Sequence, residues 1–223
     1  MTQIIHIMVA CAIQLLTGIL AYQYLSHRID GKCQSKEFLR LKFDFALLMV
    51  VLVAFFISVF IFCKGYLLES EAFMRALMNA EVMMWLSIIG YIDARERIVP
   101  NSLIGIGLLF WLVLMLLDIF VGGTPWLQLL VFSGIGGIVC GGVLFIIALI
   151  AKSALGMGDV KLFLVLGLLY GLTDAYGILL FSVIAMGIVS IILLIAKKVN
   201  RKSKIPMAPF VIIGFLLSIL AGM

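Results

Sequence analysis

Two aspartates in this chain have the surroundings needed for acid–base chemistry. Asp93 lies at the end of one apolar segment, and Asp159 lies at the start of another. A carboxylate beside hydrocarbon is costly, so such acids usually have a function. Two carboxyls that lie close together cannot both ionise easily, so they share one proton. The ionised acid takes a proton from water while the protonated acid polarises a carbonyl, which is general acid–base hydrolysis of a peptide bond without a covalent intermediate.

The residues around Asp159 predict how it is presented. Gly156 and Gly158 precede it, and glycine permits backbone angles that are closed to other residues. The chain can therefore turn before a helix and place Asp159 at the helix start, where the dipole and free N–H groups favour a carboxylate. A second interpretation is that Asp159 only caps the helix, with Lys161 as a snorkelling anchor.

The residues after Asp93 predict a helix end. Pro100 and Asn101 follow it and break the chain before the next apolar segment begins. Asp93 is also open to interpretation as a polar cap, with Arg95 and Arg97 as markers of membrane topology. Two independent caps need not lie on the same side of a membrane, so their combination favours a shared site.

The elements that position these acids are predicted to be membrane helices. Apolar residues make up 65% of the 223, charged residues only 12%, and the mean hydropathy is +1.30. A soluble domain needs more polar surface than this. A span needs about 20 apolar residues. Eight segments qualify, so we expect an all-α, polytopic helical bundle: 3–25, 44–63, 76–93, 102–121, 127–151, 159–173, 176–196 and 207–222.

The basic residues predict which loops face the cytoplasm. With the amino terminus outside, the inside loops are 26–43, 94–101, 152–161 and 197–206, and they hold 14 of the 16 lysines and arginines. This bias sets the topology of a membrane protein. It places Asp93 and Asp159 on the same, cytoplasmic, face.

We expect one continuous bundle with two parts, residues 1–75 with the first spans and residues 76–223 with the core. The glycine-rich stretch 134–142 is predicted to let a neighbouring helix pack closely. The formal net charge of +5 reflects the flanks of membrane spans, so no nucleic-acid partner is expected. The four cysteines lack metal-binding spacing, so no metal is expected.

Three motifs in order resemble the type IV prepilin peptidases, which are membrane aspartyl peptidases of the GxGD kind. They are Asp93…Pro100-Asn101, Gly156-Met-Gly-Asp159-Val-Lys161 and Ile205-Pro206-Met-Ala-Pro209-Phe210, and the resemblance covers residues 76–223. It implies that Asp93 and Asp159 are the catalytic pair and that Gly156 and Gly158 shape the loop. Lys161, Pro100, Asn101, Pro206 and Pro209 match family positions.

The resemblance also implies a substrate and a place. The partner is a prepilin or pseudopilin precursor, cut between a basic leader and an apolar helix at the cytoplasmic face of the bacterial inner membrane. Longer family members carry paired cysteine motifs that are associated with methylating the new amino terminus. Residues 26–43 are short and contain only Cys33. Methyltransferase activity and a need for S-adenosylmethionine are therefore not expected. The sequence leaves the oligomeric state open.

Two other functions are consistent with parts of the sequence. An ion-coupled transporter also uses intramembrane carboxylates and glycine-broken helices, but it predicts repeated halves, which the sequence lacks. An assembly subunit with a decayed site would not need both aspartates in their motifs. Glu81, inside the segment 76–93, is predicted to have a partner in the bundle or a water pocket.

Overall fold

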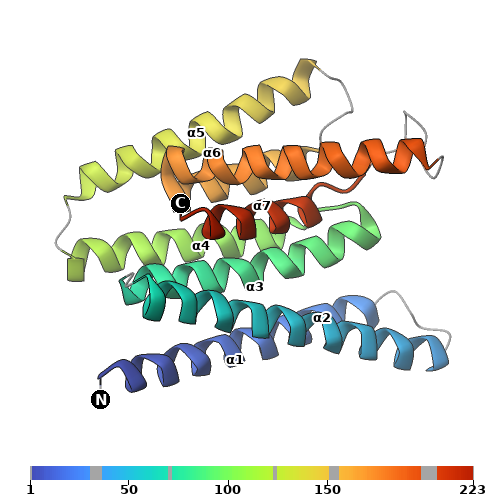
Figure 1. The fold of residues 1–223 in the computed structure, drawn as a ribbon, viewed down its shortest axis with the longest axis horizontal. Helices are drawn as coiled ribbons and strands as arrows, with labels where there is room; N and C mark the ends of the chain where they lie inside the picture. The colour runs from blue at the N-terminus through green and yellow to red at the C-terminus, as the bar shows by residue number, and fades with distance from the viewer. Residues whose placement is uncertain are drawn as a thin grey trace. The chain divides into compact units, whose positions relative to one another are not determined.

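The computed structural model describes residues 2–30, 37–69, 72–122, 125–150, 156–196 and 205–222, and it is all-helical within them. The chain forms two compact units, Met1–Tyr91 (unit 1) and Ile92–Met223 (unit 2). The elements in chain order are α1 Thr2–Asp30, α2 Glu37–Cys63, the π-helix η1 Lys64–Leu68, α3 Phe73–Glu96, α4 Asn101–Leu117, the π-helix η2 Asp118–Gly122, α5 Trp126–Ile150, α6 Met157–Ile195 and α7 Ala208–Leu220 (Figure 1).

Unit 1 contains α1, α2, η1 and α3 as far as Tyr91. Its core includes the buried side chains of Ala10, Phe62, Ala76 and Ala80. The three alanines among them let the helices approach closely, as is typical where lipid leaves no hydrophobic driving force between helices. Beside this core, the His6 Nδ1 atom lies 2.6 Å from the Tyr66 hydroxyl.

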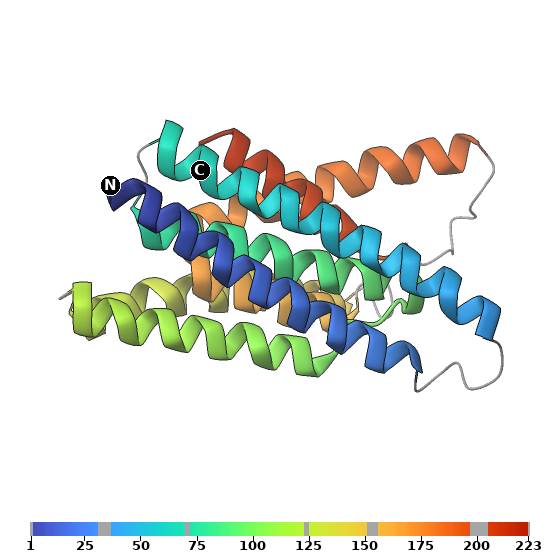
Figure 2. The ribbon, with the colours of Figure 1, turned by 90° about the horizontal axis from the view of Figure 1, so that it is seen from below.

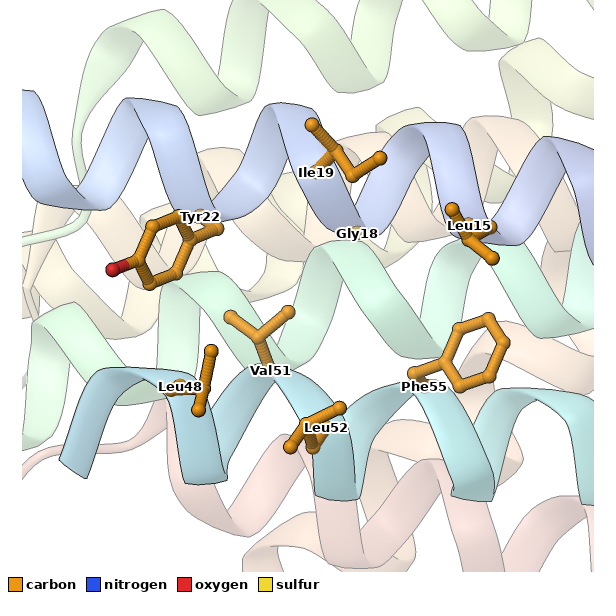
Figure 3. Close-up of a pocket in the computed structure, with 8 residues that line it drawn as sticks. All are labelled: Leu15, Gly18, Ile19, Tyr22, Leu48, Val51, Leu52 and Phe55. Atoms are coloured by element: carbon orange, nitrogen blue, oxygen red, sulfur yellow. The ribbon is translucent and has the colours of Figure 1, made fainter. Parts of the chain in front are cut away.

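A groove of about 310 Å³ lies between α1 and α2 in unit 1 (Figure 3). Its lining residues are Leu15, Gly18, Ile19, Tyr22, Leu48, Val51, Leu52 and Phe55. Aliphatic and aromatic side chains dominate this lining, and an apolar surface of this kind suits contact with lipid. None of these lining residues is an acid, a cysteine or a serine, so the groove is not a candidate catalytic site.

Unit 2 depends on close contact between α5 and the first half of α6. Gly136 and Gly167 face each other, and a Cβ added at either would overlap the other's backbone oxygen. A Cβ at Gly141 would lie 2.9 Å from Leu164 Cβ. The prediction that residues 134–142 serve packing is thus confirmed for this face of α5.

The long helix α6 bends at Gly171, which has φ 70° and ψ −169°. This backbone conformation is strained for residues with a Cβ and open to glycine. Both views show α6 as two segments that meet at a sharp change of direction (Figures 1 and 2). The second segment packs against α7, where a Cβ at Gly214 would lie 2.7 Å from the Ile178 carbonyl oxygen.

Five of the described helices are long and apolar enough to cross a membrane: Gln3–Arg28, Leu47–Leu68, Asn101–Phe120, Trp126–Ile150 and Met157–Ile195. The all-helical membrane class is confirmed, but the predicted count of eight spans is not. The segment 76–93 falls within α3, which carries several charged residues, and 207–222 becomes the 13-residue α7. The segments 159–173 and 176–196 are joined in α6, because helical structure continues on both sides of the bend at Gly171.

Candidate active site

Asp93 lies in the last turn of α3, within unit 2, and its side chain is only 5% exposed. The backbone N–H of Ala208 donates a hydrogen bond of 3.0 Å to its Oδ2 atom. The N–H of Met207 also hydrogen-bonds this carboxyl. These two N–H groups belong to the start of α7, where the helix leaves donors free and the dipole favours negative charge. The helix start thus offsets part of the cost of burying Asp93.

The sequence Pro206-Met-Ala-Pro209 explains why α7 begins at this point. Pro209 occupies the second position of the helix, where its fixed φ suits the first turn and its missing N–H leaves no bond unmade. Met207 is the N-cap, and its own side chain makes no capping hydrogen bond. The free N–H groups are consequently available to Asp93.

Asp159 lies in the first turn of α6, three residues after the N-cap Gly156. Its backbone N–H donates to the Gly156 carbonyl oxygen at 3.0 Å, and its half-buried carboxyl accepts a hydrogen bond from the Gly156 backbone N–H. The second of these bonds is half of a capping box, in which a side chain at the third helical position accepts from the N-cap N–H, while glycine offers no side chain for the other half. The prediction that Asp159 is presented at a helix start is confirmed, and the capping interpretation describes the same geometry.

The fold brings the two carboxyls together. Asp93 and Asp159 lie near enough to interact electrostatically. The chain between them forms α4 and α5, two long apolar helices, so the end of α3 and the start of α6 meet after one outward and one return helix. Asp93 is buried and Asp159 is half-buried. The interaction between like charges is stronger in such surroundings than in water.

The two motif glycines provide space and not unusual backbone angles, so our interpretation from sequence is wrong on this point. Gly156 has φ −76° and ψ 139°, which any residue adopts. Gly158 lies within α6, and among the described glycines only Gly171 and Gly222 have positive φ. A Cβ at Gly158 would lie 2.8 Å from Val99 Cβ, and one at Gly156 would lie 3.2 Å from Asp159 Oδ2. Glycine therefore lets the start of α6 lie directly against the connection after Asp93.

A hydrogen bond joins the same two segments. Lys161 Nζ donates to Asn101 Oδ1 at 2.9 Å, which links the first turn of α6 to the first residue of α4. Pro100 is the N-cap of α4, with φ −66° and ψ 132°, so the predicted chain break before this helix is confirmed. Arg97 also has a positive φ of 56° just after the end of α3, and this turns the connection sharply.

Some predicted residues lie elsewhere. Glu81 belongs to unit 1, where the Thr17 side chain hydrogen-bonds it. Pro206 is half-buried and lies just before α7, next to Met207 in the chain. Cys33 lies outside the described residues. Within those residues, no group of three His, Cys, Asp or Glu side chains is arranged to hold a metal ion.

The sequence did not reveal two contributors to the site. They are the backbone N–H groups of Met207 and Ala208, and Val99, which packs on Gly158. Backbone donors carry no side-chain signature, and Ala208 is 115 residues from Asp93 in the chain. The signal that was present was Pro209, whose position predicts a helix start and hence free N–H groups.

Fold and site define an all-helical, multi-pass membrane protein in which an acid at the end of α3 interacts with an acid at the start of α6. The model of the type IV leader peptidase family matches residues 80–191, and the chain belongs to that family. The matched region contains Asp93, Asp159 and Lys161 and ends before the start of α7. No curated protein and no solved structure matched the sequence.

Proposed function

We propose that this protein is an aspartic-type endopeptidase that removes the leader peptide from type IV prepilins or pseudopilins. Family membership supports a leader peptidase function. The observation that carries the aspartic mechanism is the electrostatic interaction between Asp93 and Asp159, both inside the family-matched region. Paired carboxyls are the groups that general acid–base hydrolysis requires.

In this mechanism the two acids hold one proton between them. The ionised acid accepts a proton from water as the oxygen of that water attacks the scissile carbonyl carbon. The protonated acid donates a hydrogen bond to the carbonyl oxygen, and its proton neutralises the charge that develops there. Collapse of the tetrahedral intermediate breaks the C–N bond, the leaving amine takes up the proton that the first acid received from water, and the second acid regains its own proton from the product. The pair titrates as a unit, so its apparent acidities belong to neither residue alone.

The surrounding residues position the pair. The Met207 and Ala208 N–H groups orient the Asp93 carboxyl, and the Gly156 N–H group orients the Asp159 carboxyl. Gly156 and Gly158 keep the space between the two segments narrow, and the bond from Lys161 to Asn101 fixes their register. Pro100, Pro206 and Pro209 set the starts of α4 and α7. Orientation of this kind lowers the entropic part of the barrier.

The location and the limits of the activity complete the proposal. We propose that the acids lie at the cytoplasmic face of a bacterial inner membrane, where a substrate's basic leader meets its apolar helix, and the distribution of basic residues supports that face. The stretch 26–43, which includes the end of α1 and the start of α2, carries one cysteine and no cysteine pair, so we propose cleavage without methylation and without a cofactor.

Mass spectrometry of the product tests this function. The purified protein is reconstituted in vesicles with a prepilin and S-adenosylmethionine, and the mature amino terminus is measured. The family resemblance implies that the cut commonly follows a glycine, so we expect a shortened pilin, cut after the glycine that ends the leader, with an unmodified amino group. A substrate with that glycine replaced by a bulky residue serves as the uncut control. An intact prepilin would refute the peptidase assignment, and a methylated product would refute the absence of methylation.

A further inference from the structure

Unit 1 contains polar side chains within its apolar interior, apart from the candidate active site. Gln14 on α1 is only 1% exposed. Thr17, one turn further along, donates from its hydroxyl to the Gln14 carbonyl oxygen at 3.0 Å, and its side chain hydrogen-bonds Glu81 on α3. We refer to Gln14, Thr17 and Glu81 as the polar layer.

The neighbours of Gln14 on α1 show where its side chain points. Ala10, one turn before it, packs in the buried cluster with Phe62 and Ala80. Gly18, one turn after it, faces α3, because a Cβ there would lie 3.7 Å from Met84 Cε. Residues four apart share a helix face. Gln14 therefore points into the interior of unit 1, at the level of α3 between Ala80 and Met84, which is where Glu81 lies.

Three buried atoms of the polar layer have no hydrogen-bond partner among the described residues. They are Gln14 Nε2, Gln14 Oε1 and Glu81 Oε1. A buried polar group left in this state costs about 1–3 kcal/mol, and lipid around the helices offers no alternative partner. The interior of unit 1 must therefore supply a partner for both a donor and two acceptors.

The mixture of donor and acceptors selects the chemistry of that partner. A cation would satisfy the two oxygens and leave the amide N–H₂ group unmet. An anion would satisfy the N–H₂ group and be repelled by the carboxyl. Water donates and accepts, and a buried water typically makes about three hydrogen bonds to groups of this kind.

We propose that the polar layer is a water-binding site, in which an ordered water bridges the Gln14 amide and the Glu81 carboxyl. This water links α1 to α3 inside unit 1 and satisfies atoms that the helices cannot satisfy themselves. The proposal is independent of the peptidase activity, because it uses none of the residues of the candidate active site.

A double-mutant cycle on thermal unfolding of the full-length protein in bilayers tests the shared water. Gln14→Leu and Glu81→Leu each leave the water and the other side chain with an unmet hydrogen bond, so each lowers the unfolding temperature. The double variant needs no water, so its loss should be smaller than the sum of the two single losses. Glu81→Gln keeps a donor and an acceptor and should stay near wild type. Additive losses in the double variant would overturn the proposal.

A control pair of variants distinguishes coupling between Gln14 and Glu81 from a general loss of stability of α3. Ser87 lies on α3 too, but its hydroxyl donates to its own helix at Met83 O, 2.8 Å away. Gln14→Leu combined with Ser87→Ala should therefore be additive. A structure of the full chain in a lipid disc, at a resolution that shows water, should reveal density within hydrogen-bonding distance of Gln14 and Glu81. A direct Gln14–Glu81 bond, or a cation in that density, would refute the water.

Discussion

The contact between Gly158 and Val99 controls how closely the two acid-bearing segments approach. A Cβ at residue 158 would lie 2.8 Å from Val99 Cβ, which is closer than real Cβ contacts. We expect Gly158→Ala to push the start of α6 away and to lower the cleavage rate on the order of 10²-fold, because misplacement by about 1 Å costs that much. The measurement is the rate of prepilin cleavage in vesicles.

Two further variants make the Gly158 prediction specific. Val99→Gly removes the nearest atoms and should restore part of the rate when combined with Gly158→Ala. Gly105→Ala, on a helix start with no described atom within 4 Å of the added Cβ, should leave the rate unchanged. A Gly158→Ala protein that cleaves at the wild-type rate would contradict the role of this contact.

Lys161 and Asn101 are expected to act as one pair. Lys161→Met and Asn101→Leu each remove the same 2.9 Å hydrogen bond, so each should lower kcat/KM by up to about tenfold. The double variant should be no worse than the more impaired single variant, and Lys161→Arg should keep part of the rate. Losses that multiply in the double variant would show that the two side chains act separately.

At this scale the sequence revealed the acids but not the groups around them. Asp93 and Asp159 were predictable because an acid at a membrane edge is costly and because the charge bias placed both on one side. The role of Gly156 and Gly158 was predicted wrongly, because the sequence does not distinguish a glycine that provides space from one that adopts a positive φ. The amides of Met207 and Ala208 needed the tertiary structure, which brings α7 to Asp93.

At the scale of helices, the packing of α5 on α6 is the feature that sets the position of Asp159. Gly136 touches the backbone of α6, whereas Gly134, on the same helix, has no described atom within 4 Å of an added Cβ. We expect Gly136→Ala to destabilise the protein by about 1–3 kcal/mol, as overpacking does. Gly134→Ala should be neutral or slightly stabilising, because alanine favours helix.

Thermal unfolding of the two variants in the same bilayer provides the comparison. Equal unfolding temperatures for Gly134→Ala and Gly136→Ala would contradict the close contact. The glycine-rich stretch was predictable as a packing face from composition alone. Which of its glycines point at α6 was not, because the predicted helix had no known rotation about its axis.

At the scale of the whole chain, the two long helices between the acids predict that Asp93 and Asp159 lie on the same side of the membrane. Cysteine labelling can measure this. Ala94 and Met157 are exposed residues next to Asp93 and Asp159, and Trp126 is 60% exposed at the start of α5. In a variant without the native cysteines, a single cysteine at residue 94 or 157 should react with an impermeant reagent from the same side. A cysteine at residue 126 should react from the other side.

One labelling result would contradict the prediction that both acids lie on the same side of the membrane. Reaction of residues 94 and 157 from opposite sides would mean that an odd number of crossings separates them. The membrane class was predictable because composition alone excludes a soluble fold. The number of spans was not, since hydropathy cannot show that α6 continues as helix on both sides of Gly171 or that α7 is short.

The central claim is that Asp93 and Asp159 act together on one water, and the kinetics of their asparagine variants test it most directly. Asp93→Asn and Asp159→Asn should each lower kcat for prepilin cleavage by about 10²–10⁴-fold, and the double variant should be no slower than the single ones. Asp174→Asn, a change in the same α6 helix, should cleave normally. Cleavage at the wild-type rate by a folded Asp93→Asn or Asp159→Asn protein would contradict the claim.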